Sequence, residues 1–91
     1  MKLSLFLDDK SKWCQGNFAT NAHGMPVDPL DLKAISWCIE GAMVVCRYTL
    51  AEGANVLADI YRKTGSATHI WQDNPGRTFD EVRKLLLDIG H

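Results

Sequence analysis

Apolar residues recur every three or four positions in the last third of the chain, which is the spacing of one face of an α-helix. The segment from Thr78 to Glu81 has the Ser/Thr-x-x-Glu form of a capping box, in which side chains satisfy free backbone N–H groups at a helix start. We therefore predict that the last helix begins here. Its apolar face consists of Phe79, Val82, Leu85, Leu86 and Ile89.

A second capping box, from Thr49 to Glu52, predicts another helix. This helix should end at Thr64-Gly65, because glycine readily adopts the left-handed conformation that closes a helix. We assign its packed face by the same helical spacing. That face consists of Leu50, Ala54, Leu57 and Tyr61.

The central segment predicts a third helix, from Asp28 to about Tyr48. Asp28 can accept a backbone N–H as the N-cap residue, and Pro29 loses nothing at the first helical position. Gly41 in a helix interior costs about 1 kcal/mol relative to alanine, so we expect something large to pack closely against it. The apolar residues form two stripes: Leu32, Ile35, Ile39, Met43 and Cys46, and Trp37, Gly41, Val44 and Tyr48.

Weaker patterns occupy the rest of the chain. Residues 1–9 fit either a strand or a helical turn, and we favour a short helix. From Trp13 to Val27 we expect an ordered loop or a small β-hairpin, and Pro75 and Gly76 suit the central positions of a type II turn. The predicted fold class is mainly α: a compact bundle of three to four helices with one long ordered loop or small β-hairpin near the N-terminus.

Composition limits the function. The 91 residues leave room for one hydrophobic core, so residues 1–91 should form a single small helical domain. The chain contains ten Lys and Arg residues and 11 Asp and Glu residues, and the basic residues form no long run. This composition argues against nucleic-acid binding. The apolar stretch after Met1 is too short for a signal peptide or a membrane span, so we expect a cytoplasmic protein.

The three cysteines, Cys14, Cys38 and Cys46, agree with that compartment. Their number is odd, and Cys38 and Cys46 would lie about 12 Å apart on one predicted helix, too far for a disulfide. We therefore expect reduced thiols.

Three tryptophan-containing phrases extend over almost the whole chain: Trp13 to Gly16, Ser36 to Ala42, and Trp71 to Thr78 followed by Glu81-Val82. In this order they resemble an uncharacterised family of short bacterial and phage proteins, whose members have roughly W-x-Q-G, W-C-x-x-G-A and W-N-D-x-x-G-R-T-x-x-E-V. The chain departs from that pattern at Gln72, where the family tends to have asparagine, and in a first helix shortened at its amino end. The resemblance supports the fold and implies no activity.

The same phrases contain our candidate residues for binding a ligand or partner, and each candidate has a structural alternative. The three tryptophans would wall an apolar pocket or, as we favour, build the core of a small domain. Arg77 would help to hold an anion or would pair with Asp73 and tie the turn to the loop around Gln15, which we favour. The candidates are Trp13, Gln15, Trp37, Trp71, Asp73, Asn74 and Arg77.

Catalytic and metal sites have weaker support. A nucleophilic Cys14 or Cys38 would need His23 or His69 as a base, and Cys38 lies between two large apolar residues on a helix that we expect to be buried. A zinc site lacks both the C-x-x-C pair and the H-x-x-x-H spacing that make such sites recognisable. We predict no catalytic residue, no metal and no cofactor.

Two functions from different classes remain. The first is a small interaction or regulatory accessory protein of bacterial or phage origin, which binds an unknown protein partner or itself. It predicts an exposed apolar patch, on the order of several hundred Å², that includes residues such as Phe18, Met25 or Tyr48. The second is a small-ligand-binding domain with a pocket walled by tryptophans. An enzyme ranks third, and neither nucleic acid nor membrane is an expected partner.

Overall fold

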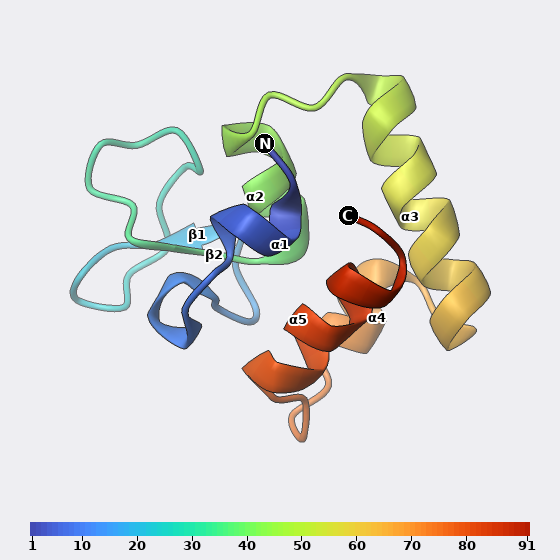
Figure 1. Cartoon of the computed structure of the whole chain (residues 1–91). Helices are drawn as coiled ribbons and strands as arrows, with labels where there is room; N and C mark the ends of the chain where they lie inside the picture. Colours follow the sequence, from blue (N-terminus) through green and yellow to red (C-terminus); the bar gives the residue numbers. More distant parts are fainter.

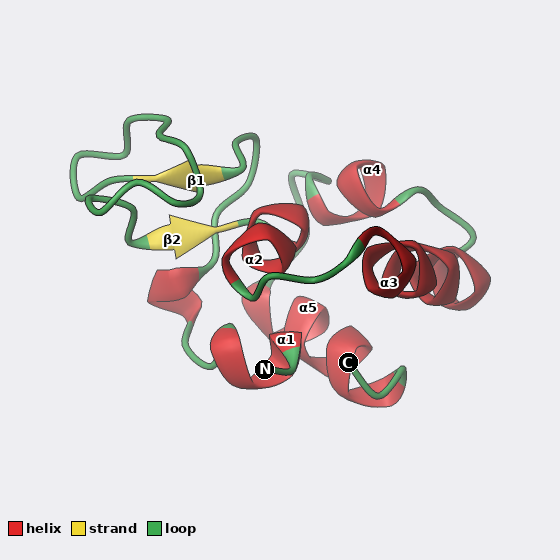
Figure 2. Cartoon of the chain, turned by 90° about the horizontal axis from the view of Figure 1, so that it is seen from above, coloured by secondary structure: helices red, strands yellow, loops and turns green.

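The computed structural model describes all 91 residues. Its helices gather into one cluster, and the two strands with their long connecting loop lie on one side of that cluster (Figures 1 and 2). This arrangement confirms the predicted fold class. The elements are α1 (Leu3–Phe6), the 3-10 helix η1 (Lys10–Lys12), β1 (Ala19–Thr20), β2 (Ser36–Trp37), α2 (Ile39–Val45), α3 (Leu50–Thr64), α4 (Thr68–Gln72) and α5 (Phe79–Asp88).

The hydrophobic core lies where α1, α2, α3 and α5 meet. The predicted face of α5 is confirmed, since its central residues are buried and Phe79 and Ile89 pack against the core. The short helix near the N-terminus is also confirmed, and it buries Leu3. None of the helices combines the length and the apolar character that crossing a bilayer requires. The core residues are Leu3, Leu7, Ile39, Ala42, Met43, Val56, Ile60, Val82, Leu85 and Leu86.

Both capping boxes are present. The Thr49 hydroxyl accepts the Glu52 N–H at 3.1 Å, and the Glu52 carboxylate accepts the Thr49 N–H at 2.8 Å. Thr78 and Glu81 repeat this exchange at the start of α5. Gly65 closes α3 in the left-handed conformation, with φ of 74°. These helix ends are therefore determined by residues adjacent in sequence.

The predicted helix from Asp28 to Tyr48 is wrong in its first half. Residues 28–35 form a loop, β2 follows, and the helix begins only at Ile39. The Asp28 carboxylate does accept a nearby backbone N–H, that of Leu30 at 2.8 Å, but this bond closes a local turn instead of starting a helix. Leu32 is fully exposed and Ile35 is 50% exposed, so neither belongs to the core, whereas Trp37 packs against it from β2.

Long-range strand pairing replaces that part of the helix. β1 and β2 are antiparallel, with Ala19 opposite Trp37 and Thr20 opposite Ser36. The hairpin expected between Trp13 and Val27 is also present, because the Val27 N–H donates to the Ala19 carbonyl at 3.0 Å. β1 therefore has backbone partners on both sides.

The predicted face of α3 is wrong. Val56 and Ile60 are the buried residues of this helix, whereas Leu50 is 96% exposed and Tyr61 is 60% exposed. The helix has apolar residues on two adjacent sides, and periodicity does not reveal which side the other helices cover. The uncovered side consists of Leu50, Ala54, Leu57 and Tyr61, which we call the α3 stripe.

The turn after α4 begins at Asn74, whose carbonyl accepts the Arg77 N–H at 2.9 Å. Pro75 and Gly76 occupy its central positions as predicted. The type II assignment is wrong, because that type needs a positive φ at Gly76 and Gly76 does not have one. The Asn74 side chain accepts the Gly76 N–H at 3.0 Å, which stabilises the turn in its observed form.

The close packing expected at Gly41 is confirmed. A Cβ atom at this position would lie only 2.8 Å from the carbonyl carbon of Phe18 and would collide with its carbonyl oxygen. The backbone just before β1 thus lies directly on α2, at a distance that only glycine allows.

We predict that Gly41→Ala destabilises the protein by about 2–4 kcal/mol, because the loop backbone must move away from α2. Urea unfolding monitored by tryptophan fluorescence measures this change. Gly53→Ala in α3 is the matched control, since its Cβ would lie 3.8 Å from the Met43 sulfur. The control should gain about 0.5–1 kcal/mol from higher helix propensity. A Gly41→Ala variant as stable as the parent protein would refute the packing argument.

Candidate functional site

A buried amide joins three separate segments of the chain. The Gln72 side chain, at the end of α4, is only 2% exposed. Its Oε1 atom accepts hydrogen bonds from the Trp13 indole N–H at 2.9 Å and from the Ile39 backbone N–H at 3.1 Å. Its Nε2 atom donates to the Asp73 carboxylate. Gln72 thereby holds the Trp13 segment and the start of α2 against α4.

Gln15 and Asp73 extend this network. The Gln15 amide donates to the carbonyls of Gln72 at 2.8 Å and Asn74 at 2.9 Å, while Asp73 accepts the Gly16 N–H at 3.0 Å. The expected tie between the turn and the loop around Gln15 is therefore present. The expected pairing of Asp73 with Arg77 is absent, because Asp73 bonds to Gly16 and Gln72.

Arg77 makes its contacts within its own region of the chain. Its Nε donates to the Trp71 carbonyl at 3.0 Å, and its guanidinium lies 3.9 Å from the centre of the Trp71 ring. It also forms an ion pair with Glu81 at 3.1 Å. Arg77 thus links α4, the turn and the first helical turn of α5.

The three tryptophans pack against the core, and none of the larger pockets is lined by more than one of them. The Trp37 ring lies 5.0 Å from that of Phe6, and its indole N–H donates to the Pro29 carbonyl. The Trp13 ring lies 6.4 Å from that of Phe79, while Trp71 stacks with the arginine of the turn. These contacts agree with the structural alternative that we favour, in which the three tryptophans help to build the core. A binding role for the candidate residues stays a prediction.

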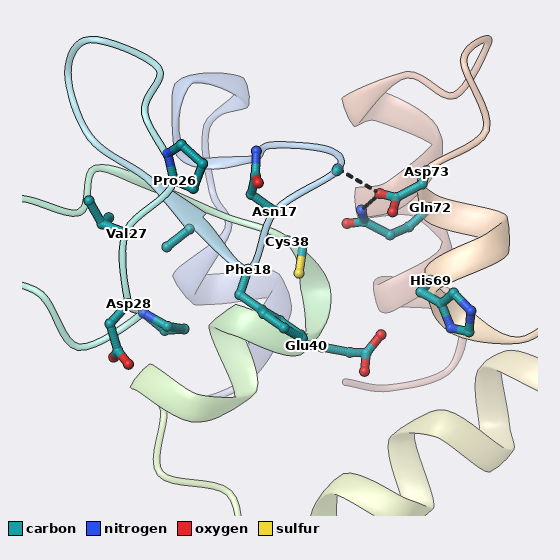
Figure 3. Close-up of a pocket in the computed structure, with 13 residues that line it drawn as sticks. Asn17, Phe18, Pro26, Val27, Asp28, Cys38, Glu40, His69, Gln72 and Asp73 are labelled. Atoms are coloured by element: carbon teal, nitrogen blue, oxygen red, sulfur yellow. Dashed lines mark hydrogen bonds between the residues drawn. The ribbon is translucent and has the colours of Figure 1, made fainter.

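A cleft of about 750 Å³ opens between the β1 loop, α2 and α4 (Figure 3). Asp73 is the only one of the seven candidate residues that lines it. Figure 3 shows the Phe18 ring and the Glu40 carboxylate near its centre, with the His69 ring on the α4 side. The full lining is Gly16, Asn17, Phe18, Ala19, Pro26, Val27, Asp28, Pro29, Cys38, Glu40, His69, Gln72 and Asp73. Few features of the sequence indicate this cleft, because its walls meet only through long-range pairing.

The Cys38 thiol faces this cleft but is unsuited to nucleophilic chemistry. Burial raises its pKa to about 11, so the thiolate is scarce at neutral pH. The sulfur instead accepts the Gly41 N–H at 3.3 Å and caps α2. The structure brings no three His, Cys, Asp or Glu side chains together in a way that could hold a metal ion.

A second hollow, which we call the α2–α3 groove, has a volume of about 560 Å³ and is mostly apolar. Glu40 is the only charged residue in its lining, and Phe18 and Glu40 separate it from the cleft. A smaller hollow continues it along α3 from Leu57 to Tyr61. The groove is lined by Phe18, Glu40, Met43, Val44, Tyr48, Thr49, Leu50, Gly53, Ala54 and Leu57. We had expected Phe18 and Tyr48 in an apolar patch, but not this one beside α3.

The chain belongs to a family of unknown function, described as "Family of unknown function (DUF6197)", whose model matches residues 3–89. This agrees with the resemblance to an uncharacterised family. No curated protein and no solved structure matches the chain.

We predict that Gln72→Met destabilises the fold by about 2–4 kcal/mol, because the Trp13 indole N–H and the Ile39 backbone N–H would both lose their buried acceptor. Urea unfolding checks this value. His69→Met, which changes an exposed residue of the same helix, should shift stability by less than about 0.5 kcal/mol. Equal stabilities of the two variants would contradict the central place of Gln72.

We also predict slow alkylation of Cys38. At pH 8 a thiol with a pKa of about 11 contains roughly 100-fold less thiolate than one with the ordinary cysteine pKa of 9.0, so iodoacetamide should react with it at least that much more slowly than in urea. Because the folded-state pKa is raised, this thiol's contribution to stability is intact below pH 9 and is lost as the pH rises towards 11. Peptide mass spectrometry measures the rate, and equal rates in folded and unfolded protein would refute the assignment.

Proposed function

We propose that this member of a family of unknown function is a protein-interaction domain that binds an apolar helical segment in the α2–α3 groove. The observation that carries the proposal is the α3 stripe, which lies along the groove and remains largely uncovered. Contiguous apolar surface of this kind is uncommon on small soluble proteins and marks interaction sites.

The shape of the site suits a helix. Helices bind in grooves through apolar residues at helical spacing, and such grooves have apolar walls with few charges. Here α3 forms one wall, Val44 of α2 is another exposed apolar contact, and the Phe18 ring stands at the end towards the β1 loop. A polar ligand would find only Glu40 as a charged contact.

The polar network supports this function indirectly. Gln72 fixes the start of α2 through the Ile39 N–H, and Gly41 fixes the Phe18 backbone against the same helix. Both walls that α2 and Phe18 contribute are therefore held in place by the tryptophan-containing phrases. We assign Trp13, Gln15 and the other candidate residues a supporting part in binding through this scaffold.

Small-ligand binding is the second candidate function, and the cleft beside Cys38 favours it. Its volume of about 750 Å³ falls within the range of ligand pockets. A thermal-shift screen against nucleotides, sugars and amino acids tests this candidate. A ligand at 100 times its dissociation constant would add about 2.7 kcal/mol of stability. A flat screen would count against it.

The interaction function predicts photo-crosslinking at the groove. With p-benzoylphenylalanine in place of Leu57, irradiation of cells that express the protein should give covalent protein adducts, because the probe then lies in the binding site. The matched control places the same probe at Leu87, which is exposed on α5. Adducts at Leu87 alone, or none at either position, would contradict the proposal. Mass spectrometry of the adducts identifies what was captured.

A further inference from the structure

The α3 stripe has the spacing of a coiled-coil seam. Leu50, Ala54, Leu57 and Tyr61 are separated by four, three and four residues, which is the alternation of core positions in heptads. The helix covers 15 residues, so the stripe occupies nearly its full length. A second helix can therefore pack along all of it.

This spacing is the same when it is read in either direction. If a second α3 packs antiparallel around a two-fold axis, Leu50 lies opposite Tyr61 of the other copy, and Ala54 lies opposite its Leu57. A large residue thus meets a small one at the centre, and two large residues meet at each end. Such self-complementarity is what a two-fold symmetric interface requires.

The residues beside the stripe permit close approach. Ala51 and Ala58 flank it on one side and Gly53 on the other, and the two-fold axis brings Ala51 of each copy next to Ala58 of the other. Small side chains allow two helix axes to approach to about 8 Å. No charged residue lies on the stripe or at these flanking positions, so α3 of the other copy meets no charge in the groove except that of Glu40.

The position of α3 leaves room for such a partner. Figures 1 and 2 show α3 at the edge of the molecule, beyond α4 and α5. Val56 and Ile60 attach it to the core on the adjacent side. Leu50 and Tyr61, at the two ends of the stripe, are the most exposed of its large residues.

We propose that the occupant of the α2–α3 groove is α3 of a second copy of this chain, so that the protein forms an antiparallel, two-fold symmetric dimer. This inference rests on the proposed function and names its partner. Two helices of this length bury less than the roughly 1,200 Å² of a standard interface, although Val44 and Phe18 add contacts. We therefore expect a dissociation constant in the micromolar range.

The test measures molecular mass by sedimentation velocity over protein concentrations from about 5 to 500 µM. The purified wild-type chain should change from monomer to dimer over this range. Leu50→Lys and Tyr61→Glu should each stay monomeric, because each places a charge in the apolar seam twice per dimer. Asn55→Lys adds the same charge to an exposed position of α3 away from the stripe and should dimerise like the wild type. Circular dichroism verifies that all variants remain folded.

Mixing the two monomeric variants tests the register. In the antiparallel pair, the new lysine of one chain faces the new glutamate of the other, and the second Leu50–Tyr61 contact is unchanged, so an equimolar mixture should form heterodimers. A parallel pair would leave each new charge opposite an apolar residue and would give no dimer. Failure of the mixture to associate would therefore overturn the proposed geometry.

The remaining outcomes separate this inference from the proposed function. A wild-type chain that stays monomeric at every concentration, or a Leu50→Lys variant that still dimerises, would overturn the second copy as the occupant. If the probe at Leu57 nevertheless captures a different protein, the interaction function stands with another partner. If it captures no protein, both proposals fail.

Discussion

The structure depends on the buried side-chain amide of Gln72. An amide in a protein interior is costly unless its polar atoms are paired, and here one oxygen accepts from both Trp13 and Ile39 while the nitrogen donates to Asp73. This single side chain brings together segments that lie 59 and 33 residues away in sequence. In a domain with very short strands and only two long helices, these hydrogen bonds hold distant segments together, as strand pairing does in proteins with larger sheets.

The predictable parts of the fold are those determined by neighbouring residues. The capping boxes at Thr49 and Thr78 and the closing Gly65 were correctly placed, because their partners lie within three or four positions. The segment around Ser36 was misassigned, because its strand conformation depends on pairing with Thr20, which local patterns do not contain. Tertiary pairing there overrides the helical periodicity of Ile35 and Ile39.

The site was predictable in its parts and not in its arrangement. The tie around Gln15 and Asp73 followed from the phrases, but Gln72 was noted only as a departure from the family pattern and proves to be the centre of the network. The groove was missed because α3 has two apolar sides. Which side is covered depends on where α4 and α5 lie, and no pattern within α3 contains that information.

The packing of the helices accounts for both the exposed α3 stripe and the rigid surface beside it. A chain of this size has few helices, and those that pack on α3 already cover Val56 and Ile60 on the adjacent side. Rotating α3 to bury Leu57 instead would expose these fully buried residues, so a single chain cannot cover both apolar sides of α3. The stripe can therefore be covered only from outside. Because Gly41 and Gln72 fix α2 and the Phe18 backbone, the surface that an incoming helix meets is formed before it binds, which lowers the entropic cost of association.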